Sequence, residues 1–221
     1  MSGAARKKVG VLISGRGSNF DALLRASAAP GYPAEIVTVI SNRPAAAGLD
    51  VAARAGIPSA AIPHKKFASR DAFDAALTRA LESAGVEIVC CAGFMRLFSE
   101  SFVEAWRDRL LNIHPSLLPA YPGLDTHARA LRDGVKLAGC TVHFVRSEMD
   151  RGPIVGQAAV AVAPNDTEAS LAARVLKAEH QLYPECLRRV AEGRVRINDG
   201  RAVVEETAAQ PPLFNPAPTE R

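Results

Sequence analysis

The feature that most constrains the fold is a repeated pattern in which a short apolar run is followed by an amphipathic stretch. This order recurs over the first 114 residues, and the runs are apolar throughout instead of alternating with polar residues. Continuous apolar strands are typical of parallel sheets with both faces covered. Strands that alternate with helices predict a doubly wound α/β fold. The expected strands of this part are 9–13, 36–40, 60–62, 88–92 and 110–114.

The second half of the chain predicts a change of strand direction. Residues 137–145 and 154–162 are apolar runs joined by only eight residues. A connection this short favours antiparallel pairing, because a parallel crossover needs a dozen or more residues. We therefore expect a Rossmann-like fold whose mixed sheet has about seven strands, mostly parallel with an antiparallel C-terminal part.

The remaining signals predict one domain. Thr167 is a typical cap for a long helix that runs to about residue 191, and Asp199-Gly200 is typical of a hairpin turn. A chain of 221 residues can bury one sizeable core. We expect a single domain over residues 1–205 and a loosely ordered tail over 206–221.

Composition narrows the class of partner. The net charge is +4, and no basic run exceeds Arg6-Lys7-Lys8, so small anionic substrates are favoured over nucleic acid. The sequence has neither a secretory signal nor an apolar stretch of about 18 residues, which predicts a cytoplasmic protein away from membranes. None of the four cysteines has metal or redox spacing, and Cys90 and Cys91 lie in an apolar run where thiols are usually inert.

The first candidate site is the glycine-rich turn 14–19, between a strand and a helix. Free backbone N–H groups and the helix dipole can receive a phosphate in such a turn. Phe20 replaces the third glycine of a dinucleotide fingerprint, and no Gly-Lys-Ser/Thr follows. Two interpretations stay open: a phosphomonoester site, or a tight turn with a polar cap.

The second candidate site is the end of strand 110–114. A strand's period of two puts Asn112 and His114 on one face, and Pro115 helps to end the strand. Such a pair could bind a carbonyl oxygen and move a proton, or could simply be a polar strand exit. The apolar loop 93–98, which carries Arg96, could likewise border a ring-binding site or belong to the core. Ligands of doubly wound folds bind at the carboxyl ends of strands, so we expect these segments to converge.

Asp150 is expected to complete the site. A carboxylate beside an imidazole orients the ring and raises its pKa. A protonated histidine and an asparagine amide could stabilise the oxyanion that forms when an amine attacks an acyl carbon. Direct acyl transfer fits better than covalent catalysis, because no suitable serine or cysteine is present. A rival metal site of His114, His143 and Asp150 is disfavoured, since His143 should lie inside a strand, far from the loop of Asp150.

Taken together, these motifs resemble the folate-dependent formyltransferase family. The resemblance covers essentially residues 7–205, and the matching segments follow the family's order: 13–19, 92–96, 112–119, 121–123 and 150–153. It implies transfer of a formyl group from 10-formyltetrahydrofolate to the amine of glycinamide ribonucleotide, in purine biosynthesis. It implies these two small molecules as partners, no metal, no nucleic acid or membrane, and a monomer or homodimer.

The resemblance also implies a role for each candidate residue. Asn112 would bind the formyl oxygen, His114 would be the catalytic acid/base, and Asp150 would raise the pKa of His114. His143 would be structural. The ribonucleotide would be bound by Gly17, Ser18, Asn19 and Glu179. The folate pocket would be bordered by Met95, Arg96, Leu97 and Phe98, and Arg70 would lie near the glutamate end of the folate.

Some alternatives and departures remain. Arg151 stands where many relatives carry glycine or glutamate, and Leu176 where some relatives carry a polar side chain. We expect these differences to affect the affinity for the substrates more than the reaction. A methionyl-tRNA formyltransferase should have a further C-terminal domain, for which we expect the residues after about 191 to leave no room. A formyltetrahydrofolate deformylase usually has an additional N-terminal domain, whereas the glycine-rich turn of this sequence begins near residue 15. From another class, a non-catalytic phosphometabolite-binding module would need the glycine-rich turn, but not Asn112, His114 or Asp150.

Overall fold

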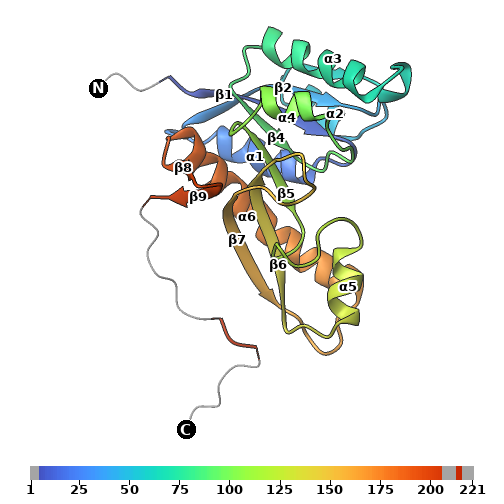
Figure 1. Ribbon diagram of the computed structural model, residues 1–221, viewed down its shortest axis with the longest axis vertical. Coiled ribbons are helices and arrows are strands. Elements are labelled where there is room, and N and C mark those ends of the chain that lie inside the picture. The colour runs from blue at the N-terminus through green and yellow to red at the C-terminus, as the bar shows by residue number, and fades with distance from the viewer. Residues whose placement is uncertain (1–4, 206–212, 216–221) are drawn as a thin grey trace.

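A seven-stranded sheet forms the centre of the computed structural model, which describes residues 5–205 and 213–215. The strand order is β3-β2-β1-β4-β5-β6-β7 (Figure 1). The strands are β1 Lys7–Ile13, β2 Ala34–Ser41, β3 Ser59–Ala61, β4 Ile88–Cys91, β5 Leu110–His114, β6 Leu137–Phe144 and β7 Ile154–Ala161. A separate hairpin consists of β8 Val195–Asn198 and β9 Arg201–Val204. The tail expected at 206–221 lies outside the described residues, apart from 213–215.

The sheet is mixed, as the sequence predicts. The strands β3, β2, β1, β4 and β5 are parallel to one another. The two pairings of β5 with β6 and of β6 with β7 are antiparallel. The register of β5 and β6 sets Asn112 opposite His143, which brings a second histidine to the candidate site.

Helices cover both faces of the sheet. They are α1 Ser18–Ser27, α2 Gly48–Arg54, α3 Arg70–Ser83, α4 Glu100–Ala105, α5 Thr126–Arg132 and α6 Glu168–Ala191, with the short 3₁₀ helix η1 at His64–Lys66. Alternate residues of β1 face opposite cores: Val11 packs with the core of α1 and α6, whereas Leu12 packs with that of α3 and α4. This two-sided burial explains why the strands are continuously apolar.

Local signals set several helix starts. The Ser69 side chain accepts a hydrogen bond from the Ala72 backbone N–H and begins α3. Thr167 and Ser170 form a capping box at the start of α6, so the predicted cap is confirmed. Within the residues that the structure describes, no helix combines the length and apolarity that a membrane crossing requires.

Candidate active site

One buried serine connects three strand exits at the carboxyl edge of the sheet. The Ser14 hydroxyl donates to Asn42 Oδ1 at 2.6 Å and accepts from the Met95 backbone N–H at 2.8 Å. The Ser14 backbone N–H donates to the Gly93 carbonyl at 3.1 Å. The ends of β1, β2 and β4 are thereby held together. Sequence reasoning did not give Ser14 and Asn42 this role, although each is a polar residue directly after an apolar strand.

The glycine-rich turn is held in a conformation that requires glycine. Gly17 has a φ of 77°, and a Cβ there would lie 3.0 Å from the Gly48 Cα. The Gly48 backbone N–H donates to the Gly15 carbonyl at 3.0 Å, so the start of α2 packs directly on the turn. The first N–H groups of α1, at Ser18 and the residues after it, have no partner within the helix and carry its positive dipole end.

Asn19 and Glu179 meet beneath this turn. Both side chains are buried, and Asn19 Nδ2 donates to Glu179 Oε2 at 2.6 Å. Burial raises the pKa of Glu179, although the hydrogen bond from Asn19 opposes the shift. Asn19 Oδ1 is buried without a partner among the described residues. The structure therefore joins two predicted ribonucleotide contacts, 160 residues apart in the chain, into one polar pair.

The predicted catalytic residues also come together. Asp150 Oδ2 lies 3.5 Å from His114 Nδ1 and accepts from the Gly123 backbone N–H at 2.8 Å. On its other side, His114 Nε2 lies 2.9 Å from the Tyr121 carbonyl oxygen, and the ring is buried. Asn112 lies two residues before His114 on the same face of β5. An amide, an imidazole and a carboxylate thus share one strand end.

The expectation that His143 lies far from Asp150 is wrong. His143 Nε2 is 3.8 Å from Asp150 Oδ1 and 3.3 Å from Asn112 Nδ2. The connection from β6 to β7 folds back on β6, because Gly152 packs so tightly that a Cβ would lie 1.6 Å from the Phe144 carbonyl oxygen. Asp150 has a φ of 55°, a conformation that aspartate tolerates better than most residues.

His143 behaves as a neutral partner of Asn112. Its Nδ1 lies 3.0 Å from the Phe144 carbonyl oxygen, to which an Nδ1–H can donate. Its Nε2 can then accept from the Asn112 amide. Burial lowers the pKa of His143, which favours this neutral form. Within residues 5–205 and 213–215, no group of three or more His, Cys, Asp or Glu side chains is arranged to hold a metal ion.

The loop after β5 is fixed by two polar side chains that sequence reasoning missed. Thr141 Oγ1 donates to the Ser116 carbonyl at 2.7 Å and accepts from the Leu118 backbone N–H at 3.0 Å. Gln157 Nε2 donates to the Leu118 carbonyl at 2.8 Å. Gln157 is the single polar residue of the apolar strand β7, and Thr141 is a buried polar residue of β6 together with His143; these polar positions in apolar runs were the available signal.

The predicted folate-binding loop exposes apolar side chains beside its arginine. Met95 is 58% exposed and Leu97 56%, whereas Phe98 stacks on Phe94 with ring centroids 5.2 Å apart. The Arg96 guanidinium lies 5.7 Å from the centre of the Phe73 ring. Arg70 is exposed at the start of α3, outside the Asn112, His114 and Asp150 cluster.

Comparisons with known proteins place this arrangement in a family. A sequence model described as formyl transferase matches residues 7–187. The chain belongs to the formyl transferase family. This confirms the resemblance deduced from the motifs.

Relatives of this formyl transferase include single-function and multifunctional proteins. The phosphoribosylglycinamide formyltransferase of Escherichia coli (strain K12) is 42% identical over 87% of this chain and 91% of that protein. The trifunctional purine biosynthetic protein adenosine-3 of Drosophila melanogaster is 53% identical over 87% of this chain, which spans 14% of that protein's length. The crystal structure of glycinamide ribonucleotide transformylase 1 from Symbiobacterium toebii matches with a TM-score of 0.90 and 45% identity, over 93% of this chain and 100% of that chain.

Proposed function

We propose that this formyl transferase moves the formyl group of 10-formyltetrahydrofolate to the amine of glycinamide ribonucleotide, a step of purine biosynthesis. The observation that carries the proposal is the contact of Asp150 with His114 at the end of β5, beside Asn112. Relatives of 42–45% identity whose names state this chemistry support the choice of substrate. We propose the cytoplasm as its location and a monomer or homodimer as its form.

The ribonucleotide would bind between the glycine-rich turn and α6. Its 5′-phosphate would accept from the free N–H groups around Gly17, Ser18 and Asn19, at the positive end of α1. Its amine would donate to Glu179, whose carboxylate already accepts from Asn19. A neighbouring amide and carboxylate suit an amine that must be held in place and later lose a proton.

The folate would lie against the loop after β4. Met95, Leu97 and Phe98 offer apolar surface for its rings, and Arg96 offers a charge for its carboxylate end. The Ser14 contacts with Met95 and Asn42 would keep this wall at a constant distance from the phosphate turn. Positioning of this kind is a large part of catalysis for a transfer between two bound molecules.

The chemistry would then need no covalent enzyme intermediate. The amine attacks the formyl carbon, and the new oxyanion accepts hydrogen bonds from Asn112 and from protonated His114. The tetrahedral intermediate then collapses: the bond between this carbon and N10 of the folate breaks, the proton lost by the amine is transferred to N10, and tetrahydrofolate leaves. Asp150 stabilises the positive ring at 3.5 Å. The His114 Nε2–H donates to the Tyr121 carbonyl in this structure. This hydrogen bond must break before the same N–H can donate to the oxyanion.

A transfer assay with both substrates tests the proposal. Wild-type protein should form formylated ribonucleotide and tetrahydrofolate, and His114→Ala should lower kcat/KM by roughly 10²-fold or more. His180→Gln, a histidine change on α6 outside the proposed contacts, should retain most of the activity. Unchanged far-UV circular dichroism would show that His114→Ala folds.

Two results would contradict the proposal in different ways. A wild-type protein that binds the ribonucleotide without transferring a formyl group would favour the non-catalytic binding module. Full transfer by His114→Ala would keep the reaction but remove His114 from it.

A further inference from the structure

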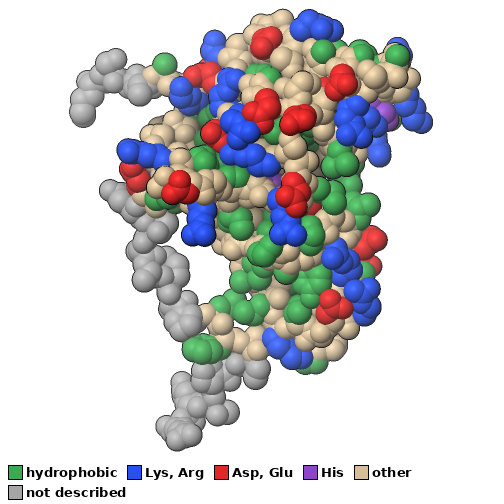
Figure 2. Space-filling model, viewed as in Figure 1, with side chains coloured by type: hydrophobic (Ala, Val, Ile, Leu, Met, Phe, Trp, Pro, Cys, Tyr) green, Lys and Arg blue, Asp and Glu red, His purple; other side chains and the backbone are tan. Residues whose placement is uncertain are grey.

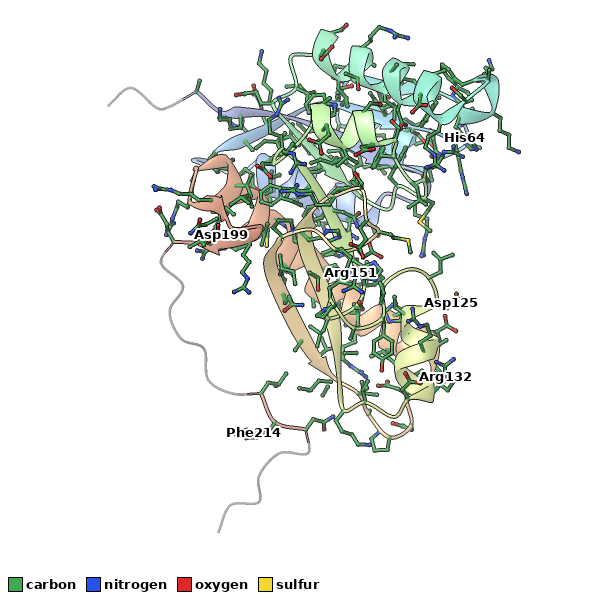
Figure 3. All side chains as sticks on the ribbon, viewed as in Figure 1. His64, Asp125, Arg132, Arg151, Asp199 and Phe214 are labelled. Carbon is green, nitrogen blue, oxygen red and sulfur yellow. The ribbon has the colours of Figure 1, made fainter. Side chains whose placement is uncertain are left out.

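An arginine of α5 lies against the loop that leads from β5 into this helix. Figure 3 labels Asp125, which precedes α5, and Arg132, the last residue of α5. Figure 2 shows Lys and Arg side chains over the helix, at the right of the molecule. The arginine is Arg129, which lies in the last turn of α5 and is half-buried. Neither the sequence motifs nor the proposed chemistry gives Arg129 a role.

Arg129 makes three contacts with residues 121–124. Its Nη1 donates to the Pro122 carbonyl oxygen at 2.6 Å and to the Leu124 carbonyl oxygen at 3.3 Å. Its guanidinium also lies over the Tyr121 ring, 5.4 Å from the ring centre. Among the described residues no carboxylate pairs with Arg129, so the loop carbonyls receive the full positive charge.

These contacts support a part of the loop that the sheet does not hold. The polar side chains of β6 and β7 bind the loop only up to Leu118. In the part of the chain that the structure describes, the side chains that hydrogen-bond to the backbone of residues 121–124 are those of His114, Asp150 and Arg129. The first two are the reactive groups themselves. Arg129 is therefore the support that holds this segment independently of them.

The peptide group between Pro122 and Gly123 connects Arg129 with Asp150. Its carbonyl accepts from Arg129, and its N–H donates to Asp150 Oδ2 at 2.8 Å. This peptide is trans, so its carbonyl and its N–H point in opposite directions from one rigid plane. A contact that fixes the carbonyl on one side thus also fixes the direction of the N–H on the other. A carbonyl bound to a cation is polarised as well, which strengthens the N–H as a donor.

The direction of the Gly123 N–H matters because of the oxygen that it binds. Asp150 Oδ2 is the same oxygen that lies 3.5 Å from His114 Nδ1. Holding this oxygen keeps the carboxylate turned toward the imidazole. The Tyr121 carbonyl belongs to a different peptide plane, which can rotate separately. It can therefore leave His114 while Arg129 and the Gly123 N–H keep Asp150 in place.

We propose that Arg129 is a positioning residue for formyl transfer, and that it acts through the Pro122–Gly123 peptide to hold Asp150 against His114. The proposal rests on the proposed function, because it assumes that these two groups serve the transfer. Misplacing a reacting group by about 1 Å can lower a rate on the order of 10²-fold, so the loss of one orienting contact should be measurable in kcat. The proposed contacts of the ribonucleotide and the folate lie on other elements, so binding of both should change little.

Kinetics of two Arg129 variants test this role. Arg129→Met removes the charge and the donors but keeps an unbranched side chain, and should lower kcat about tenfold at saturating substrates. The KM for glycinamide ribonucleotide should stay close to the wild-type value. Arg129→Lys keeps a cation and a donor for the Pro122 carbonyl, so its kcat should lie between those of Arg129→Met and the wild type.

The same helix offers a matched control. Arg132→Met makes the same change at an exposed arginine, which pairs with Asp133 at 3.1 Å instead of with the loop, and should retain the wild-type kcat. An unchanged kcat in Arg129→Met, or an equal loss in Arg132→Met, would overturn the proposal.

A double-mutant cycle tests whether Arg129 acts through Asp150. Asp150→Asn alone should lower kcat strongly, and adding Arg129→Met to it should lower kcat little further, because the group that Arg129 positions is already lost. Losses that simply multiply in the double variant would show that Arg129 acts by another route, and would refute the proposal.

Amide hydrogen exchange without substrates keeps the test independent of the reaction. The Gly123 N–H, which donates to Asp150, should exchange about tenfold faster in Arg129→Met than in the wild type. The amides of the buried strand β1 should exchange equally in both proteins, which shows that the variant is folded. Equal exchange at Gly123 would refute the positioning role even if transfer occurs. Faster exchange at Gly123, combined with a wild type that transfers no formyl group, would instead refute the proposed function and leave the link between Arg129 and Asp150.

Discussion

Glu179 shows how one buried contact can set a residue's chemistry. It is 6% exposed, and its Oε2 accepts a hydrogen bond from Asn19. The hydrogen bond stabilises the ionised carboxylate, whereas burial destabilises it. Burial is the larger effect and raises its pKa. If Glu179 binds the amine of the ribonucleotide as a carboxylate, that binding should weaken on acidification sooner than an exposed glutamate would allow.

Glu179→Gln should therefore raise the KM for glycinamide ribonucleotide by about tenfold or more at neutral pH, since a charge-assisted hydrogen bond is lost. The wild-type KM should rise as pH falls below neutrality, because Glu179 becomes protonated. The KM of the variant should not show this rise. Glutamine can still accept from Asn19, so the fold should hold. Glu185→Gln, an exposed change on the same helix, serves as the control. Parallel pH profiles for wild type and Glu179→Gln would contradict the role of Glu179.

At the scale of elements, the connection from β7 to α6 is stabilised by one carboxylate. Asp166 accepts from Arg174 at 2.7 and 2.9 Å, from Ser170 Oγ at 2.7 Å and from the Ala163 backbone N–H at 2.7 Å. These contacts, with Arg174 the largest, hold the pKa of Asp166 well below its ordinary range. A depressed folded-state pKa adds stability above the unfolded pKa of about 3.9, and that stability is lost as pH falls.

Asp166→Asn should lower the melting temperature by a few degrees at pH 7. The difference from wild type should shrink near pH 3, where the wild type also loses part of this charge. Asp21→Asn removes an exposed pair with Arg25 one helical turn away, so it should have little effect at either pH. Thermal unfolding followed by circular dichroism measures all three proteins. A pH-independent difference for Asp166→Asn would rule out the charge as its cause.

The elements themselves could largely be predicted from sequence, because period and caps are local. The strand 110–114 and the helix cap at Thr167 are examples. The contact of His143 with Asp150 could not be predicted from sequence, because it depends on how the connection from β6 to β7 packs, with Gly152 against Phe144. Long-range pairs such as Asn19 with Glu179 need a tertiary fold, and only a family resemblance suggested both.

At the scale of the whole molecule, α6 connects the two ends of the candidate site. It carries Glu179, and the buried Tyr183 hydroxyl one turn later donates to the carbonyl oxygens of Cys91 in β4 and Leu111 in β5, at 3.1 and 3.2 Å. The same core includes α1 and β6 (Figure 1). We infer that the glycine-rich turn, β5 and α6 fold as one cooperative unit. One part of the candidate site should then not stay folded while another part is unfolded.

The four buried cysteines allow a test of that unit, because they lie in β4, β6 and α6. Burial raises the pKa of Cys90, Cys140 and Cys186 to about 12, so few thiolates exist at pH 8. Ellman's reagent should then react with native protein only through unfolding, and all four thiols should titrate along one urea transition that coincides with the loss of circular dichroism. Reaction of Cys186 or Cys140 at lower urea would show instead that α6 and β6 open separately from β4.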